Sequence, residues 1–186
     1  MANIDKALRF VFKLEYGNSP DKALEQVHGE DFLTYKGLQE KDDTDFPGWK
    51  KIHDALSLFS GDKERAGNFL EADFTLQKTV VEYYKNHYWD KIRGDEIATQ
   101  HIADEMMVAA VLYSPIPAIR MAQEVVGVKN DGIIGSKTIE ALNSFDASIF
   151  DKLFDEKEIE RAEMLASRNP RLAWAVKGWT NRARAV

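Results

Sequence analysis

One acidic residue near the N-terminus interrupts a row of apolar positions. Ile4, Leu8, Val11 and Glu15 have the spacing of one helix face, so Glu15 continues the row that should face the core. Partial burial and the negative end of a helix dipole both favour the protonated form of a carboxyl group. A protonated carboxyl group can act as the general acid that cleaves a glycosidic bond. The alternative is that Glu15 only ends the helix and faces solvent.

A second chemical group is expected on the segment that follows this helix. Asp31 and Glu30 are candidate partner carboxylates, with Asp21 less favoured, and the Thr34 hydroxyl could instead orient an attacking water. Inverting glycosidases hold their carboxyl groups about 6.5–9.5 Å apart and retaining ones about 5–5.5 Å apart. Sequence does not supply this separation. For Asp31 and Thr34 the structural alternative is a capped loop.

Other common catalytic and ligand-binding motifs are not matched. The segment 132–138 resembles a phosphate-binding loop, but its lysine does not directly follow the second glycine as that motif requires. We interpret the segment as a turn and a helix cap. Cysteine chemistry and disulfides are excluded because the chain has no cysteine. We therefore predict no cofactor and no metal. The histidines are not paired at ligand spacing, and surface or core positions are expected for all of them: His28, His53, His87 and His101.

The elements that must position these groups are mostly helices. Asn3 is a suitable N-cap for the first helix, and the turn residues at 16–20 end it. We predict a mainly α protein with a lysozyme-like helical fold and a small β-hairpin between residues 17 and 48. The further helices are expected at 49–59, 69–90, 97–113, 117–126, 137–143, 149–167 and 171–182.

Composition narrows the functional classes. The chain has 186 residues, 44% of them hydrophobic, which suits one domain or two small, tightly packed ones. Its formal charge of −6 argues against a nucleic-acid-binding surface. We see no signal peptide and no apolar run long enough to span a membrane, so we predict synthesis in the cytoplasm without membrane insertion. An extracellular target would then require release or export.

Several sequence blocks resemble glycoside hydrolase family 108, the phage-like N-acetylmuramidases also labelled secretion-activator-like. The resemblance spans nearly the whole chain, and the blocks keep their order. They are Phe-Lys-Leu-Glu-Tyr-Gly at 12–17, Leu-Thr-Tyr-Lys-Gly-Leu at 33–38, Gly-Trp-Lys at 48–50, Tyr-Trp-Asp-Lys-Ile-Arg-Gly-Asp-Glu at 88–96, Ala-Ile-Arg-Met-Ala-Gln at 118–123, Gly-Val-Lys-Asn-Asp-Gly-Ile-Ile-Gly-Ser-Lys-Thr at 127–138 and Gly-Trp-Thr-Asn-Arg at 178–182.

The resemblance implies an endolysin-like muramidase that hydrolyses the bond between N-acetylmuramic acid and N-acetylglucosamine in peptidoglycan. The family's catalytic glutamate falls on Glu15, and its threonine falls on Thr34. Residues 1–91 would form the catalytic region, and residues 92–186 would form a predicted peptidoglycan-binding region packed as part of one compact unit. Asp31 could activate the water. Tyr35 and Trp49 are candidates to line the sugar subsites.

Three departures from the family pattern leave other functions open. Tyr16 stands between Glu15 and Gly17, Phe32 and its neighbours replace a glycine pair, and Val108 and Leu112 replace an aspartate and an asparagine. A peptidoglycan-binding module without activity and an accessory protein of a secretion system are therefore alternatives. A lytic transglycosylase, which also uses one glutamate, is the nearest alternative enzyme.

Overall fold

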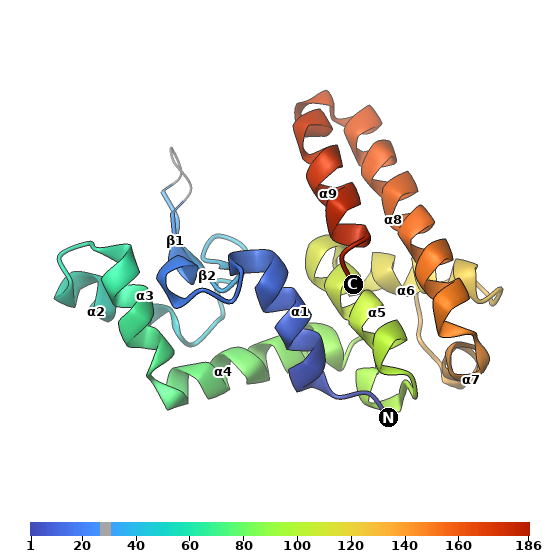
Figure 1. Ribbon diagram of the computed structural model, residues 1–186, viewed down its shortest axis with the longest axis horizontal. Helices are drawn as coiled ribbons and strands as arrows, with labels where there is room; N and C mark the ends of the chain where they lie inside the picture. The colour runs from blue at the N-terminus through green and yellow to red at the C-terminus, as the bar shows by residue number, and fades with distance from the viewer. Residues whose placement is uncertain (27–30) are drawn as a thin grey trace. The chain divides into compact units, whose positions relative to one another are not determined.

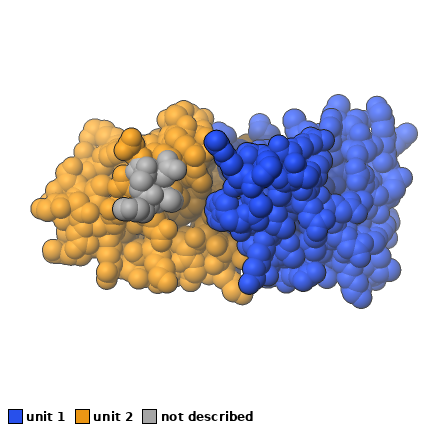
Figure 2. All heavy atoms as spheres, turned by 90° about the horizontal axis from the view of Figure 1, so that it is seen from above, with its two compact units in different colours: residues 1–10, 87–186 blue, residues 11–86 orange. Residues whose placement is uncertain are grey.

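The computed structural model describes residues 1–26 and 31–186. Within these residues most of the chain is helical, and the strands form one small three-stranded sheet (Figure 1). The predicted mainly α fold with a small sheet between residues 17 and 48 is therefore confirmed. The chain forms two compact units, coloured in Figure 2, with residues 1–10 and 87–186 in unit 1 and residues 11–86 in unit 2. The functional division at residue 91 stays a prediction.

The first helix, α1 (Ile4–Tyr16), forms as its sequence predicts. The Oδ1 atom of Asn3 accepts hydrogen bonds from the backbone N–H groups of Asp5 at 2.8 Å and Lys6 at 3.3 Å, which is N-cap geometry. The helix ends at Tyr16 and is followed by Gly17, whose φ of 68° is the left-handed conformation that glycine adopts without strain. This helix delivers Glu15 within its last turn.

Unit 2 continues with short strands and three helices. Its elements after α1 are η1 (Pro20–Lys22), β1 (Leu24–Glu25), β2 (Thr34–Tyr35), β3 (Leu38–Gln39), α2 (Trp49–Leu58), α3 (Lys63–Glu71) and α4 (Phe74–Tyr84). The single helix predicted for 69–90 is wrong, because Asp73 caps a new helix by accepting from the backbone N–H of Leu76 at 2.9 Å. A short π-helical segment, η2 (Lys85–Trp89), follows α4.

The sheet is antiparallel, with the strands in the order β1-β2-β3. Thr34 pairs with Gln39 and Tyr35 with Leu38, so only two residues connect β2 to β3. Those residues, Lys36 and Gly37, have φ angles of 51° and 90°. Positive φ at both positions is the requirement of a type I′ hairpin turn. The non-glycine residue Lys36 therefore adopts a conformation that most side chains avoid.

Unit 1 is a bundle of helices. After η2 its elements are η3 (Gly94–Glu96), α5 (Gln100–Tyr113), α6 (Pro115–Val125), α7 (Ser136–Ser144), α8 (Ala147–Arg168), η4 (Pro170–Ala175) and α9 (Val176–Ala183). Helix α8 packs against α5, α6 and α9, and Figure 1 shows α8 and α9 side by side. The helix predicted at 171–182 begins instead with the 3-10 segment η4.

Helix α5 forms the centre of unit 1. Ten of its residues are buried, among them Val108, which is 1% exposed. The helix was predicted to begin at residue 97, but it begins at Gln100. In the part of the chain that the structure describes, neither α5 nor any other helix combines the length and apolarity needed to cross a membrane.

Candidate functional site

Glu15 is half-buried near the end of α1, and its side chain lies against the hairpin turn between β2 and β3. A Cβ atom added to Gly37 would lie 2.7 Å from Cγ and 3.0 Å from Cδ of Glu15. Such distances are too short for a real Cβ, so the carboxylate-bearing chain occupies space that only glycine leaves open. The structure thus brings the predicted acid against the backbone of a short, fixed turn.

The turn itself is fixed by the buried side chain of Lys36, which is 3% exposed. Its Nζ lies 2.7 Å from Oε2 of Glu71 and donates to Oε1 of Gln77 at 2.5 Å. Its backbone carbonyl accepts a hydrogen bond from the Tyr84 hydroxyl at 2.8 Å. Burial lowers the pKa of Lys36, and the interaction with Glu71 opposes that shift. These contacts tie the turn to α3 and α4.

Two aromatic rings of α1 complete the surroundings of this lysine. The Nζ of Lys36 lies 5.3 Å from the ring centre of Phe12 and 5.5 Å from that of Tyr16, within the range of cation–π attraction. The ring of Phe12 also meets the ring of Tyr84 edge-on at 5.6 Å. Helix α1, which carries Glu15, is therefore packed directly on the turn that the same carboxylate touches.

The other predicted polar residues occupy different settings. Thr34 is half-buried on β2, paired with Glu25 and Gln39, and so belongs to the hairpin whose turn contacts Glu15. Asp31 is exposed. Glu30 lies outside the described residues, as does His28. The roles assigned to Thr34 and Asp31 in positioning or activating water stay predictions.

The two predicted sugar-lining rings lie in the core of unit 2. Tyr35 is 0% exposed, and its hydroxyl accepts a hydrogen bond from Nε2 of Gln77 at 3.0 Å. Trp49 is 8% exposed, and its indole N–H donates to the backbone oxygen of Asp43 at 2.7 Å. In this conformation neither ring offers an open face on which a sugar could stack. Their role in lining subsites stays a prediction and would require these rings to become exposed.

Sequence reasoning did not single out Lys36 and Gly37 as site residues. A signal was nevertheless present, since a Lys-Gly pair lies between Thr-Tyr and Leu-Gln, a spacing typical of a two-residue hairpin. The partners of Lys36 could not be found in this way, because Glu71 and Gln77 lie 35 to 41 positions further along the chain.

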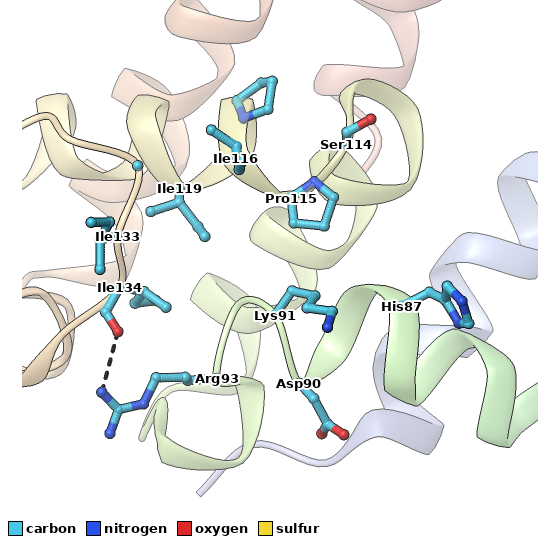
Figure 3. Close-up of a pocket in the computed structure, with 12 residues that line it drawn as sticks. His87, Asp90, Lys91, Arg93, Ser114, Pro115, Ile116, Ile119, Ile133 and Ile134 are labelled. Carbon is cyan, nitrogen blue, oxygen red and sulfur yellow. Dashed lines mark hydrogen bonds between the residues drawn. The ribbon is translucent and has the colours of Figure 1, made fainter.

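Unit 1 carries an apolar groove with a volume of about 730 Å³. Figure 3 shows isoleucine side chains from α6 and from the segment before α7 on one side, with Lys91 and Asp90 on another. Arg93 donates to the backbone oxygen of Ile134 at 3.2 Å and so joins the two walls. Ile133 is 71% exposed and Ile116 is 59% exposed, so apolar surface remains available to a ligand.

A second groove of unit 1, of about 590 Å³, is more polar. It lies between α6 and α8 and combines basic side chains with acidic and apolar ones. Lys157 is held there by Oε2 of Glu160 at 2.8 Å and Oε2 of Glu124 at 3.7 Å. Arg120 and Arg161 line the same groove, and guanidinium groups suit carboxylate ligands. The lining thus has the chemistry that an acidic, partly apolar ligand would require.

The sequence block at 88–96, which contains Trp89, is held in place by side-chain contacts. Trp89 is 0% exposed, and its indole N–H donates to Oδ1 of Asp95 at 2.7 Å. Arg93 between them has a φ of 53° and is ion-paired with Glu96. These contacts close the loop between η2 and η3, which forms one wall of the apolar groove.

Comparison with known proteins links unit 1 to peptidoglycan. Residues 117–184 match the family described as Predicted Peptidoglycan domain, so the chain is peptidoglycan-related. No curated protein matches the chain. A solved structure titled "Structure of Brucella abortus SagA" is similar, with 22% identity and a TM-score of 0.59 over 98% of this chain and 94% of that one. This likeness shows a shared fold.

Proposed function

We propose that this protein binds peptidoglycan through unit 1 and hydrolyses the bond between N-acetylmuramic acid and N-acetylglucosamine, with Glu15 as the general acid. The proposal is carried by the match of residues 117–184 to a peptidoglycan domain family, which points to the polymer. The resemblance of the N-terminal blocks to glycoside hydrolase family 108 supports the step from binding to cleavage. The site of action would be the cell wall, reached after release or export.

In the proposed reaction Glu15 gives its proton to the glycosidic oxygen as the bond from that oxygen to the anomeric carbon breaks. A water molecule then forms the new bond to the anomeric carbon. The Thr34 hydroxyl orients this water, and Asp31 accepts its proton. Contact with the turn at Gly37 supports the role of Glu15, because a fixed carboxyl group loses less freedom in reaching the transition state.

Binding is assigned to the grooves of unit 1. The polar groove lined by Arg120, Lys157 and Arg161 suits the carboxylates of peptidoglycan peptide stems. The apolar groove beside it, lined by Ile116 and Ile133, suits the apolar faces of sugars and the methyl groups of alanine. These assignments make binding separable from cleavage, since Glu15 belongs to unit 2.

The experiment compares wild type with Glu15→Gln on purified peptidoglycan. We expect release of reducing ends to fall about 10²- to 10⁴-fold, the usual contribution of a positioned general acid. Sedimentation with insoluble walls should be unchanged. The matched control is Glu82→Gln, which makes the same change at an exposed position of α4. Equal activity of Glu15→Gln and wild type would remove Glu15 from the mechanism.

Two outcomes would replace the hydrolase assignment with the alternatives. Products that end in 1,6-anhydromuramic acid, identified by mass spectrometry, would mean that no water attacks and that the enzyme is a lytic transglycosylase. Binding to walls without release of reducing ends by wild type would leave a non-catalytic peptidoglycan-binding protein. The family match alone supports that second candidate. The burial of Val108 favours neither, because a valine at a core position of α5 needs no functional reason.

A further inference from the structure

Helices α5 and α8 bring five potential metal ligands together inside unit 1. His101 and Glu105 are four residues apart on α5, so they lie on one helix face. Asp151, Asp155 and Glu158 follow the same rule on α8. The two helices pack against each other, as Figure 1 shows.

These side chains form two triads that share Glu105. One consists of His101, Glu105 and Asp151, and the other consists of Glu105, Asp155 and Glu158. In each triad the potential ligand atoms lie within 4.8 Å of one another. Three donors so close together can all coordinate one ion, since bonds from oxygen or nitrogen to divalent metals are about 2.0–2.6 Å long.

By geometry, the central carboxylates also have no hydrogen-bond partner among the residues that the structure describes. Glu105 is 0% exposed and Glu158 is 1% exposed, and none of their four carboxylate oxygens has a hydrogen-bond partner. Oδ1 of Asp155 is in the same state. Buried carboxylates are normally paired or bound to a metal, because an uncompensated charge in the interior is very unfavourable.

The neighbouring cations do not remove this deficit. Nε2 of His101 lies 3.0 Å from Oδ1 of Asp151 but 3.9 Å from Oε1 of Glu105, beyond hydrogen-bond distance. The charge of Arg182 from α9 lowers the pKa of Glu158, and the charge of Arg184 lowers the pKa of Asp155, in each case against the larger effect of burial. Among the described residues, both oxygens of Glu105 and both oxygens of Glu158 are therefore left without a hydrogen-bond partner.

We propose that these two triads form a structural site for divalent metal, in which Glu105 is the shared ligand and the ion joins α5 to α8. The His101 triad offers one imidazole and two carboxylates, and the other triad offers three carboxylates; for these donor sets we choose Mn²⁺, a first-row ion of carboxylate sites. Ca²⁺ prefers six to eight oxygen ligands. Sites rich in cysteine are impossible in this chain. The site is separate from Glu15, which belongs to unit 2.

The test uses untagged full-length protein, freed of metal with a chelator that is then removed. Addition of MnCl₂ should give saturable binding by calorimetry and should reduce the amplitude of the electron paramagnetic resonance signal of free Mn²⁺. At about one hundred times the dissociation constant, we expect the melting temperature to rise by roughly 5–10 °C. ZnCl₂ that binds more tightly at the same residues would also support the site.

Two variants locate the ion. Glu105→Gln should abolish the thermal shift and the binding, because it neutralises the ligand common to both triads. Asp104→Asn is the matched control, since Asp104 is the adjacent residue, is 3% exposed and already accepts from Gln100 at 2.7 Å. It should keep the full shift. Glu158→Gln provides an independent second test if Glu105→Gln fails to fold.

Two results would overturn the proposal. One is the absence of saturable binding of Mn²⁺ or Zn²⁺ at millimolar concentration. The other is equal binding by wild type and by both glutamine variants. A preference for Ca²⁺ over Mn²⁺ would reject the proposed class of ion. Wall hydrolysis is not used as a readout, so failure here leaves the proposed function untouched.

Discussion

Lys36 in unit 2 and Glu105 in unit 1 are both withdrawn from water, with 3% and 0% of their surfaces exposed. Lys36 has Glu71 at 2.7 Å and Gln77 at 2.5 Å, whereas neither carboxylate oxygen of Glu105 has a hydrogen-bond partner. The same degree of burial thus accompanies opposite degrees of pairing. A paired buried charge fixes local geometry, and an unpaired one indicates a ligand or a retained proton.

The largest effect is expected when Lys36 loses its counter-charge. Glu71→Gln should lower the free energy of unfolding by about 3 kcal/mol, because a buried ammonium is left without an anion. Glu71 is 36% exposed although its Oε2 atom is buried, so the rest of its carboxylate stays accessible to water when Lys36 is replaced. Lys36→Met should therefore cost less than Glu71→Gln. Urea denaturation of both variants and of the double variant measures this asymmetry, and equal costs for the single changes would contradict it.

The second prediction concerns the turn that Lys36 fixes. Gly37→Ala would place a Cβ 2.7 Å from Cγ of Glu15 and 2.9 Å from the Tyr84 hydroxyl, at a φ of 90° that alanine avoids. Glu15 must then move. We expect wall hydrolysis to fall about a hundredfold, the usual result of displacing a catalytic group by about 1 Å.

A matched control for this turn is Gly17→Ala. Gly17 also has positive φ, at 68°, but a Cβ there would meet nothing within 4 Å. Gly17→Ala should introduce similar backbone strain without moving Glu15. It should therefore lower the free energy of unfolding while changing the rate of wall hydrolysis much less. If both variants lose the same activity at matched stability, steric contact with Glu15 is not the cause.

The sequence specified the local parts of this arrangement. Helical spacing and the Asn3 cap predicted α1 and put Glu15 in its last turn, because these signals act within a few residues. The break at Asp73 was missed, although aspartate is a common N-cap. The burial of Tyr35 and Trp49 was not predicted, because alternation and spacing do not say which neighbours cover a ring.

The two triads of unit 1 also could not be predicted from local sequence signals. Helical spacing on each helix was readable from His101 to Glu105 and from Asp151 to Glu158. The spacing of the histidines along the chain predicted no metal site, because no two histidines lie at ligand spacing. That α5 faces α8 is a tertiary fact, and only this packing makes five separate residues into two triads.

The third prediction removes part of the unpaired charge from metal-free protein. Glu158→Gln, measured with chelator present at pH 8, should raise the free energy of unfolding by about 1–2 kcal/mol. Burial and the charge of Asp155 raise the pKa of Glu158 to about 8, with Arg182 opposing. Between pH 4.5 and about 8, Glu158 is therefore protonated in the folded protein, whereas in the unfolded chain it has lost its proton above the normal pKa of 4.5.

The sign of the pH dependence follows from this retained proton. The contribution of Glu158 to stability is complete below pH 4.5 and is lost as the pH rises through about 8. The advantage of the variant should thus be small at pH 5 and larger at pH 8. Burial first and the charge of Glu158 next raise the pKa of Glu105 to about 10, so the variant also relieves Glu105 and this adds to its advantage at pH 8. A variant that is less stable than wild type at pH 8 would contradict the prediction.

The smallest effect is expected for an ion pair that lies in water. Lys50 and Asp54 on α2 are 2.6 Å apart, which matches the 2.7 Å between Lys36 and Glu71, but their side chains are 84% and 64% exposed. Lys50→Ala should change the free energy of unfolding by less than about 0.5 kcal/mol, because solvent screens exposed charges. Because the distances in the two pairs are nearly equal, a much larger effect of Glu71→Gln in the same denaturation assay would reflect the buried surroundings of Lys36 rather than the closeness of the charges. Comparable effects would mean that the Lys36 pair is also hydrated, and the contrast between paired and unpaired interior charges would lose its basis.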